Sequence, residues 1–311
     1  MLLSILFFIS GLVLMIVGAD YFVKGASAVA TKFKIPQIVI GPTIVAMGTS
    51  APEACISISS ALKGSTGVAI GNVLGSNIIN VLFILGLTSA ICALKLEKNS
   101  VKYEIPFLIL ITTFLCGFGY YFNVLDRIFG LILLALFAVF FIYLFKVAIK
   151  SSQQEDEQAS VAKLNPFLMV IFILGGLVAL VYGSDISVNS AIDIAKQLNI
   201  SERIIGLTIV ALGTSLPELV TSVIAALKKQ ADIAVGNIVG SNIFNILFVL
   251  GLTCTICPVN FDPAFIFDGI VAILTVLLLF IFTVCDRKLN RWEGILFLLM
   301  YVAYTVYLVI K

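Results

Sequence analysis

Two glutamates lie within long apolar stretches of the chain, in almost the same local sequence. Glu53 ends the hexapeptide GTSAPE and Glu218 ends GTSLPE. A charged side chain at the centre of a bilayer costs at least about 2.5 kcal/mol, so acids in such surroundings are rare and usually functional. Their repetition predicts that the two carboxylates act together on a positively charged ligand.

Each glutamate follows residues that break a helix. Pro52 and Pro217 remove a backbone donor and clash with the carbonyl four residues earlier, while Gly48 and Gly213 tolerate unusual backbone angles. We therefore expect each helix to break here and to expose carbonyl and hydroxyl oxygens, which is tolerated only beside protein or a water-filled cavity. The expected oxygen donors are the freed carbonyls of Ala46 and Ala211 and the hydroxyls of Thr49, Ser50, Thr214 and Ser215.

A second pair of motifs carries amides and hydroxyls four residues apart, a spacing that puts them on one helical face. The motifs are GNVLGSNIIN and GNIVGSNIFN, with Asn72, Ser76 and Asn80 in the first and Asn237, Ser241 and Asn245 in the second. Oxygen ligands without sulfur or imidazole favour hard cations such as Ca²⁺ or Na⁺. Two carboxylates balance one Ca²⁺ or two Na⁺, so the two ions can compete for one site and exchange for each other.

These motifs belong to a long internal repeat. The segment 41–87 aligns without a gap on the segment 206–252, with more than half of the positions identical. The same offset pairs Asp20 with Asp185, so the repeated unit starts at the first helix of each half. Each half is therefore one copy of an ancestral module.

Composition indicates that the solvent of this fold is lipid. Apolar residues make up 61% of the chain and charged residues 12%, and apolar stretches of about 20 residues recur along it. We predict an all-α polytopic membrane protein with five transmembrane helices in each of two repeats, 1–149 and 165–311, joined by a linker at 150–164. The expected helices are 2–23, 37–62, 66–94, 104–122 and 128–149, then 165–183, 203–227, 231–256, 264–284 and 292–310.

An odd number of helices in each repeat predicts that the second repeat is inverted relative to the first. Lys and Arg accumulate in cytoplasmic loops. Fourteen of them fall in the loops after the odd-numbered helices and five on the opposite side. This pattern predicts a multi-pass protein of the plasma or cell inner membrane, with both termini extracytoplasmic and residues 150–164 cytoplasmic. Inverted repeats are typical of secondary transporters, whose sites lie between the repeats.

The four motifs GTSAPE, GSNIIN, GTSLPE and GSNIFN resemble the two alpha-repeats of the sodium/calcium exchanger family in the cation/calcium antiporter superfamily, in a compact prokaryotic-type form. The resemblance covers all ten spans. It implies a secondary active antiporter that exchanges Na⁺ for Ca²⁺ by alternating access, usually three Na⁺ for one Ca²⁺, and is therefore electrogenic. By position, it implies coordination by Ala46, Thr49, Ser50, Glu53, Ser76, Asn80, Ala211, Thr214, Ser215, Glu218, Ser241 and Asn245.

Several alternatives stay open at this point. Asn245 stands where potassium-dependent relatives, and some prokaryotic exchangers, carry an aspartate, which argues against K⁺ co-transport, but K⁺-dependent or H⁺-coupled exchange and a passive channel are alternatives. An intramembrane enzyme is disfavoured because the chain has no histidine and no HExxH motif. Because the chain has no histidine and no second cysteine pair, we interpret the lone pair Cys254 and Cys257 as incidental rather than as a zinc site.

The remaining acidic features are expected to lie outside the cation site. Asp20 and Asp185 fall near the ends of the first and sixth predicted helices, so we expect a structural or access role for them. The acidic run 153–158 is expected to be a solvated linker rather than a regulatory calcium site. The expected partners are Ca²⁺, Na⁺ and the lipid bilayer, with no cofactor, no nucleic acid and no obligatory protein partner.

Overall fold

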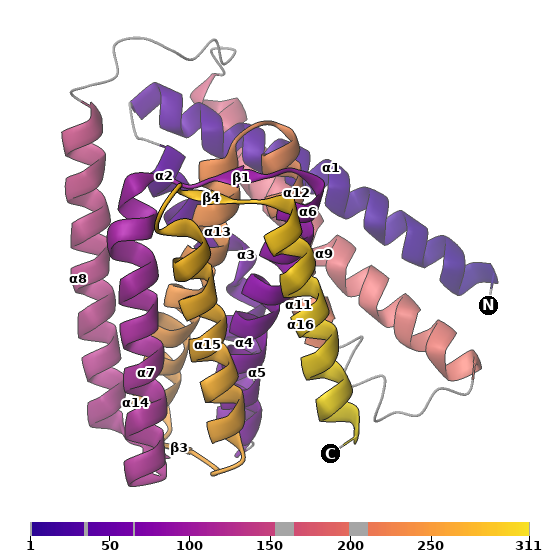
Figure 1. Ribbon diagram of the computed structural model, residues 1–311. Coiled ribbons are helices and arrows are strands. Elements are labelled where there is room, and N and C mark those ends of the chain that lie inside the picture. Colours follow the sequence, from indigo (N-terminus) through magenta and orange to yellow (C-terminus); the bar gives the residue numbers. More distant parts are fainter. Residues whose placement is uncertain (1, 34–36, 65, 153–164, 199–210, 311) are drawn as a thin grey trace.

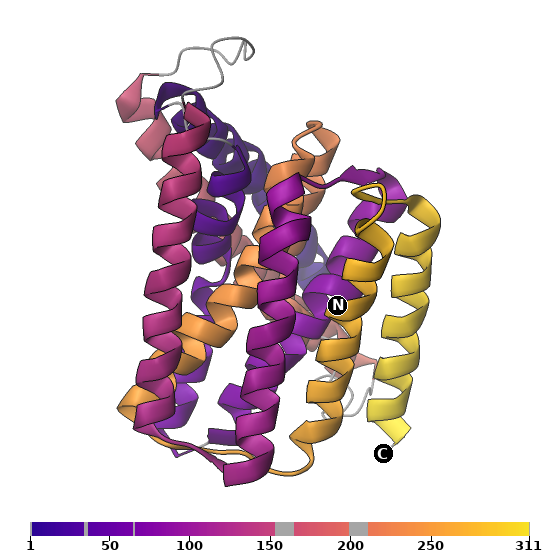
Figure 2. The ribbon, with the colours of Figure 1, turned by 60° about the vertical axis from the view of Figure 1, so that its left-hand side comes forward.

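The computed structural model describes residues 2–33, 37–64, 66–152, 165–198 and 211–310. Within them the secondary structure is helical apart from two short two-stranded ribbons (Figures 1 and 2). Most of the predicted linker at 150–164, with its acidic run, and the first part of the predicted helix at 203–227 lie outside the described residues.

The first repeat contains, in chain order, α1 (Leu2–Phe33), α2 (Gln37–Ile40), the π-helical turn η1 (Gly41–Val45), α3 (Ala46–Thr49), α4 (Ala51–Leu62), α5 (Thr66–Ile78), the π-helical η2 (Ile79–Leu85), α6 (Gly86–Ile91), β1 (Leu94–Lys95), η3 (Ser100–Glu104), α7 (Ile105–Phe122), β2 (Val124–Leu125) and α8 (Arg127–Ser152). The second contains α9 (Pro166–Gln197), α11 (Ala211–Thr214), α12 (Leu216–Leu227), α13 (Ala231–Phe244), the π-helical η5 (Asn245–Leu250), α14 (Gly251–Ile256), β3 (Val259–Asn260), α15 (Phe265–Thr283), β4 (Lys288–Leu289) and α16 (Arg291–Ile310). Seven of the described spans are individually long and apolar enough to cross a membrane. The predicted all-α membrane fold is confirmed.

Two ribbons join the repeats at opposite ends of the bundle. β1 pairs with β4, with Leu94 opposite Leu289, and β2 pairs with β3, with Leu125 opposite Val259. β1 and β3 follow the third segment of their own repeats, whereas β2 and β4 precede the fifth. In Figure 1 β1 and β4 lie at the top and β3 at the bottom. Equivalent loops thus lie at opposite ends, as expected for an inverted repeat.

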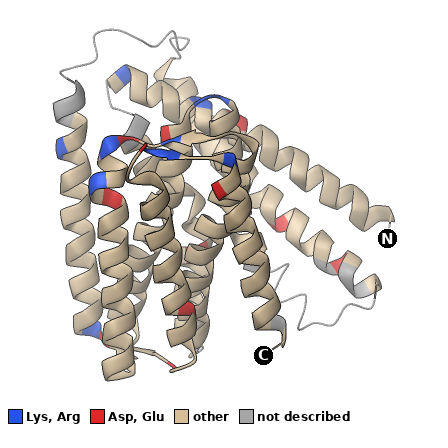
Figure 3. Cartoon of the chain, viewed as in Figure 1, with Lys and Arg blue, Asp and Glu red and all other residues tan. Residues whose placement is uncertain are grey.

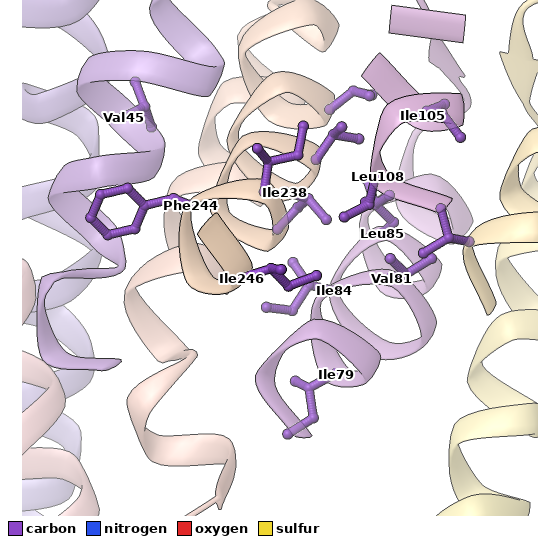
Figure 4. Close-up of a cluster of buried hydrophobic side chains, with 14 of the residues drawn as sticks. Val45, Ile79, Val81, Ile84, Leu85, Ile105, Leu108, Ile238, Phe244 and Ile246 are labelled. Carbon is purple, nitrogen blue, oxygen red and sulfur yellow. The ribbon is translucent and has the colours of Figure 1, made fainter. Parts of the chain in front are cut away.

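The third segment of each repeat forms the centre of the protein. In the span 231–256, 94% of the most apolar stretch is buried, and in 66–91 the share is 72%, whereas the other five spans bury 33% or less. Figure 4 shows Val81 and Ile84 of η2 in one apolar cluster with Ile238 and Ile246 of the second repeat. The outer helices cross between repeats, because α8 packs on α14 and α16 packs on α6. The two repeats therefore share one core.

Helices α1 and α9 run side by side as a tilted pair at one side of the bundle (Figure 1). Glycines set their separation: a Cβ at Gly176 would lie 2.7 Å from the carbonyl oxygen of Gly18, and one at Gly183 would lie 2.8 Å from that of Gly11. Both distances are too short for any side chain. Close helix approach at small residues is a common way of packing helices in membranes.

The predicted ends of the first and sixth helices, at residues 23 and 183, are wrong. α1 continues to Phe33 and α9 to Gln197. Hydropathy falls after residue 23 because Lys24 follows, but Lys24 pairs with Asp20 one turn earlier at 2.6 Å. The small residues Ala26 and Ala30 are buried in this extension, which packs toward α12. A helix can therefore continue beyond its apolar stretch where small side chains pack on a neighbour.

Charge is distributed unevenly over the two ends. Figure 3 shows most Lys and Arg of the described chain at the end that carries β1 and β4. Lys95 and Lys288 lie in that ribbon, directly opposite each other. The end with β2 and β3 has no Lys or Arg in its ribbon. The fold thus gathers the basic loops of both repeats at one end.

Candidate cation-binding site

The second segment of the first repeat is interrupted at Ser50. This residue has φ −84° and ψ 9°, which ends α3 and starts α4. Ser215 interrupts the equivalent segment of the second repeat with φ −91° and ψ 6°. Pro52 and Pro217 follow in the first turns of α4 and α12, where the missing backbone donor costs no hydrogen bond within the half-helix that starts there. Both predicted helix breaks are confirmed, with nearly the same geometry.

Glu53 and Glu218 lie in the first turns of α4 and α12 and are completely buried. The N-terminal end of a helix carries partial positive charge, so each break stabilises a carboxylate beside it. Each carboxyl group is hydrogen-bonded to the serine that precedes the other half-helix, so the two carboxyl groups lie near each other. The half-helices α4 and α12 therefore bring both acids to one place between the repeats.

Each carboxyl group is held by the break of the other repeat. The hydroxyl of Ser50 donates to Glu218 Oε1 at 2.8 Å, and that of Ser215 donates to Glu53 Oε1 at 3.4 Å. The neighbouring hydroxyls that also interact with these groups are Thr49, with Glu218, and Thr214, with Glu53. Both repeats therefore contribute to the surroundings of each acid.

Four asparagines cross-link the third segments of the two repeats, whose π-helical parts pack on the half-helices that carry the acids, η5 on α4 and η2 on α12. Asn77 Nδ2 donates to the carbonyl of Asn242 at 3.2 Å, and Asn242 Nδ2 donates to the carbonyl of Asn77 at 3.1 Å. The side-chain oxygen of Asn242 accepts from Asn80 Nδ2 at 2.9 Å, and that of Asn77 accepts from Asn245 Nδ2 at 3.2 Å. Because Asn80 and Asn245 use their amide nitrogens in this network, the orientation of both amides is fixed.

Among the buried side-chain oxygens of the described chain that have no hydrogen-bond partner, four belong to the two glutamates and to Asn80 and Asn245. They are Oε2 of Glu53, Oε2 of Glu218, Oδ1 of Asn80 and Oδ1 of Asn245. Each of these residues is at most 1% exposed. Buried polar atoms are nearly always satisfied, because an unpaired one is costly. Two carboxylate and two amide oxygens without donors form the kind of ligand set that a hard cation satisfies.

A backing layer fixes the backbone behind each acid. Asn72 Nδ2 donates to the carbonyl oxygen of Glu53 at 3.1 Å, and Asn237 Nδ2 donates to that of Glu218 at 3.4 Å. The same two amides also bond to serine hydroxyls one turn further along α4 and α12, Ser57 and Ser222, each at 2.9 Å. The first asparagine of each motif thus holds the third segment to the half-helix that carries the acid.

The predicted single helical face of Asn72, Ser76 and Asn80 is divided in the structure. Asn72 bonds to α4, whereas Asn80 bonds across to α13. The π-helical η2 begins at Ile79, and its wider turn changes the direction in which Asn80 points relative to the α-helix before it. The π-helical η5 begins at Asn245 in the second repeat. A strict spacing of four residues therefore did not predict the contacts of these side chains.

The carbonyl of Ala46 is not released by the break, contrary to the prediction. It accepts the backbone N–H of Ser50 at 3.0 Å and the hydroxyl of Ser241 at 3.5 Å. Proline removes the donor for the residue four positions earlier, so the carbonyls that lose their helical donor are those of Gly48 and Gly213. The carbonyl of Gly213 accepts the hydroxyl of Ser184 at 2.8 Å.

Two further predicted residues lie in α5 and α11. Ser76 is buried at 3% exposure in α5, four residues before Asn80. Ala211 is the first residue of α11, three residues before Thr214. Among the described residues, no group of three or more His, Cys, Asp or Glu is arranged for a metal ion.

Asn77 and Asn242 are the site residues that sequence reasoning missed. Both lie in the quoted motifs, at equivalent positions and three residues before Asn80 and Asn245. Their repetition was the available signal, but their role depends on contact between the two repeats. Only the fold shows that each orients an amide of the opposite repeat.

Asp20 and Asp185 lie away from the two glutamates and differ from each other. Asp20 pairs with Lys24 at 2.6 Å and with Lys228 at 2.7 Å. In the other repeat, Asp185 corresponds to Asp20 and Lys63 corresponds to Lys228. Both are exposed and form no ion pair with each other in the described chain. The structure thus gives Asp20 a contact between α1 and the end of α12, and gives Asp185 no such contact.

Comparison with known proteins points to one family. The sequence model described as "Sodium/calcium exchanger protein" matches residues 3–146 and 168–310, one match in each repeat. Inner membrane protein YrbG of Escherichia coli is 37% identical over 85% of this chain and 83% of its own length. Sodium/calcium exchanger MaX1 of Methanosarcina acetivorans is 34% identical over 98% of each chain.

A solved structure of the sodium-calcium exchanger NCX_Mj has the same fold. It superposes with a TM-score of 0.84 and 32% sequence identity, over 97% of both chains. The family match therefore extends to the arrangement of the helices that carry the buried acids. The chain belongs to the sodium/calcium exchanger family, and is thus a membrane cation/Ca²⁺ exchanger and not an enzyme.

Proposed function

We propose that this protein exchanges Na⁺ for Ca²⁺ as a secondary active antiporter, with Glu53 and Glu218 binding the two ions in turn. The observation that carries the proposal is the set of four buried oxygens without a partner, on Glu53, Glu218, Asn80 and Asn245. One Ca²⁺ or two Na⁺ neutralise two carboxylates. Occupation by either ion removes the cost of the buried charges and of the unpaired oxygens.

The remaining predicted ligands complete the coordination of Ca²⁺ and of further Na⁺ ions. Na⁺ and Ca²⁺ take several oxygen ligands each, so a site for more than one ion needs more than the four unpaired oxygens. In this proposal the additional ligands come from Thr49, Ser50, Ser76, Ala211, Thr214, Ser215 and Ser241. When more than two Na⁺ replace one Ca²⁺, charge moves with each cycle and the exchange is electrogenic.

Alternating access follows from the inverted repeats in this proposal. Each acid is hydrogen-bonded by the break of the opposite repeat, so a shift of one repeat against the other changes the surroundings of both acids together. Only a loaded site crosses the barrier, because an empty one retains two carboxylates that repel each other. Exchange is then obligatory, which separates this mechanism from a passive channel.

The names of similar proteins support this function. MaX1 is named a sodium/calcium exchanger, and NCX_Mj is named a sodium-calcium exchanger whose crystals were soaked with Na⁺ and with Sr²⁺ or Ca²⁺. Asn245 supports independence from K⁺, because its amide donates to Asn77 Oδ1. An aspartate at this position could not make that bond.

We further propose that the protein lies in the cell inner membrane, with the β1–β4 ribbon at the cytoplasmic end. The gathering of Lys and Arg at that end supports this orientation (Figure 3), and the name of YrbG supports the membrane. In this orientation the start of α1 and the end of α16 lie on the extracytoplasmic side, so both termini are extracytoplasmic. The linker 150–164 is cytoplasmic.

Transport in liposomes tests the function. Vesicles loaded with Na⁺ are diluted into choline, K⁺ or Na⁺ media, and into media of different pH, and uptake of ⁴⁵Ca²⁺ is followed. We expect uptake that needs an outward Na⁺ gradient, responds to membrane voltage, ignores K⁺ and is lost in Glu53→Gln and Glu218→Gln. Uptake driven by a pH gradient without Na⁺ would assign H⁺ coupling, a requirement for K⁺ would assign K⁺ dependence, and flux without any counter-ion would exclude exchange.

A further inference from the structure

A cavity of about 390 Å³ lies beside the β1–β4 ribbon, at the basic end of the bundle. We call it the basic groove, and it is lined by Lys98, Val101, Lys102, Phe280, Val284 and Arg287. One wall comes from the first repeat, at the start of the span 100–122, and the other from the second, at the end of α15. The groove therefore bridges the two repeats at the end of two membrane spans.

The lining of the basic groove combines positive charge with an apolar floor. Its three polar residues, Lys98, Lys102 and Arg287, are all exposed cations, and no acid is among the residues that line it. The other three are apolar, and Val284 is 47% exposed. A soluble anion would use the cations but not the apolar floor. A phosphate that carries hydrocarbon would use both.

Arg287 is held firmly at the mouth of the groove. Its φ of 56° is unusual for a residue other than glycine. Its carbonyl accepts the N–H of Leu96 at 2.7 Å, and its own N–H donates to the carbonyl of Thr283 at 2.9 Å. The turn therefore fixes the start of the Arg287 side chain between β1 and α15.

The inverted repeat provides an internal comparison at the other end of the bundle. The β2–β3 ribbon has the same turn, because Asn123 has φ 56° and its carbonyl accepts the N–H of Phe261 at 2.8 Å. Asn123 thus occupies the position of Arg287. The matching loops at this end, 116–125 and 259–268, contain no Lys or Arg. The fold of the ribbon therefore does not require the three cations of the basic groove.

We propose that the basic groove binds the headgroup of an acidic phospholipid from the leaflet at this end of the protein. The phosphate lies between Lys98, Lys102 and Arg287, and an acyl chain packs on Phe280 and Val284. Basic pockets between membrane helices recognise acidic headgroups through charge, and Arg and Lys bind phosphate oxygens well. A lipid bound here contacts both repeats beside the ribbon that joins them, and so stabilises their junction.

Thermal unfolding of the purified full-length protein in detergent tests the proposal. Phosphatidylglycerol and phosphatidylcholine with identical acyl chains are added in parallel, and native mass spectrometry counts the lipids retained. We expect phosphatidylglycerol to raise the melting temperature more and to be retained. The combined variant Lys98→Gln, Lys102→Gln and Arg287→Gln should lose this preference, with affinity for the acidic lipid reduced about a hundredfold.

A matched control removes three other basic residues, as Lys32→Gln, Lys146→Gln and Arg291→Gln, and should keep the preference. If the groove variant folds poorly, two single variants replace it. Lys102→Gln should retain less acidic lipid than the unchanged protein. Arg287→Lys, which keeps the charge, should retain as much. Equal retention by the groove variant and the control would overturn the proposal. So would an equal effect of the two lipids, or a full effect of inorganic phosphate alone.

Discussion

The hydroxyl of Ser50 in the first repeat lies 2.8 Å from the carboxyl oxygen Oε1 of Glu218 in the second. The equivalent contact, from Ser215 to Glu53 Oε1, is longer at 3.4 Å. The two halves of the site are therefore alike in chemistry and unequal in geometry. A serine in the break of one repeat thus holds the carboxyl group of the other repeat.

Replacing these serines should affect cation binding unequally. A hydrogen bond to a charged group contributes about 1.5 to 3 kcal/mol, and the shorter bond is the stronger one. We expect Ser50→Ala to weaken the apparent affinity for Ca²⁺ in transport by about tenfold or more and Ser215→Ala by less, with both proteins folded. Ser59→Ala, whose hydroxyl bonds only to the carbonyl of Ile56 among described residues, is the control. Equal effects of the two site variants would contradict the account.

A third carboxylate in the site should change its ion requirement. Asn245→Asp removes the donor to Asn77 Oδ1 and faces that oxygen with a second acceptor, beside two acids that already repel each other. We expect about a tenfold loss of apparent Ca²⁺ affinity and a new dependence of transport on K⁺ or on pH, because a further cation is needed for charge balance. Flux assays across K⁺ concentration and pH measure both effects.

The exposed Asn260→Asp in β3 adds the same charge far from the site and should leave the ion requirement unchanged. If Asn245→Asp transports Ca²⁺ with unaltered affinity and no new cation dependence, Asn245 does not contribute to the ligand set.

The ion pair between Asp20 and Lys228 should form in only one of the two conformations between which the transporter alternates. Lys228 Nζ also donates to the backbone carbonyl of Asp20 at 2.9 Å, whereas Lys63 and Asp185 at the equivalent positions form no ion pair in the described chain. If the repeats exchange conformations, the second pair forms when the first one breaks. Lys228→Gln and Lys63→Gln should then shift the population in opposite directions, each by up to about fivefold for a partly exposed pair.

Hydrogen–deuterium exchange in the last turns of α1 measures this shift. Lys228→Gln should speed exchange in residues 24–33, and Lys63→Gln should slow it. Changes of the same sign in both variants would show that the pairs are only local surface contacts.

Close packing of α1 on α9 should make two adjacent glycines respond oppositely to alanine. A Cβ at Gly176 would meet the carbonyl oxygen of Gly18 at 2.7 Å and the backbone nitrogen of Phe22 at 2.7 Å, whereas one at Gly175 meets nothing within 4 Å. We expect Gly176→Ala to lower the free energy of unfolding by about 1 to 3 kcal/mol. Gly175→Ala should be neutral or raise it by up to about 1 kcal/mol, because alanine favours helix. Melting temperatures in detergent compare the two, and a stable Gly176→Ala protein would refute the close approach.

The fold was largely predictable because its main signals are local or repeated. Apolar stretches locate most of the helices, the odd number of spans predicts the inversion, and Pro52 with Gly48 predicts the break at Ser50. The ends of α1 and α9 were missed because small residues and a paired Lys24 extend these helices beyond their apolar part. Hydropathy does not register packing on a neighbouring helix.

The candidate site was predictable in its residue types but not in its contacts. Glu53 and Glu218 follow from repetition in an apolar setting, yet the orienting role of Asn77 and Asn242 depends on contact between the repeats. The carbonyl of Ala46 was predicted to be free, but it accepts the backbone N–H of Ser50 although the helix breaks at Ser50. Such pairings depend on backbone angles at the break and on π-helical turns, which sequence spacing does not give.

Binding of ⁴⁵Ca²⁺ to the purified protein at equilibrium, with and without Na⁺, tests the central claim most directly. Na⁺ should displace the bound Ca²⁺, and either Glu53→Gln or Glu218→Gln should abolish binding. Glu104→Gln, which removes another buried carboxylate of the membrane region at 1% exposure, should leave it intact. Ca²⁺ binding that persists when both Glu53 and Glu218 are replaced, or that Na⁺ fails to displace, would contradict a shared site between the repeats.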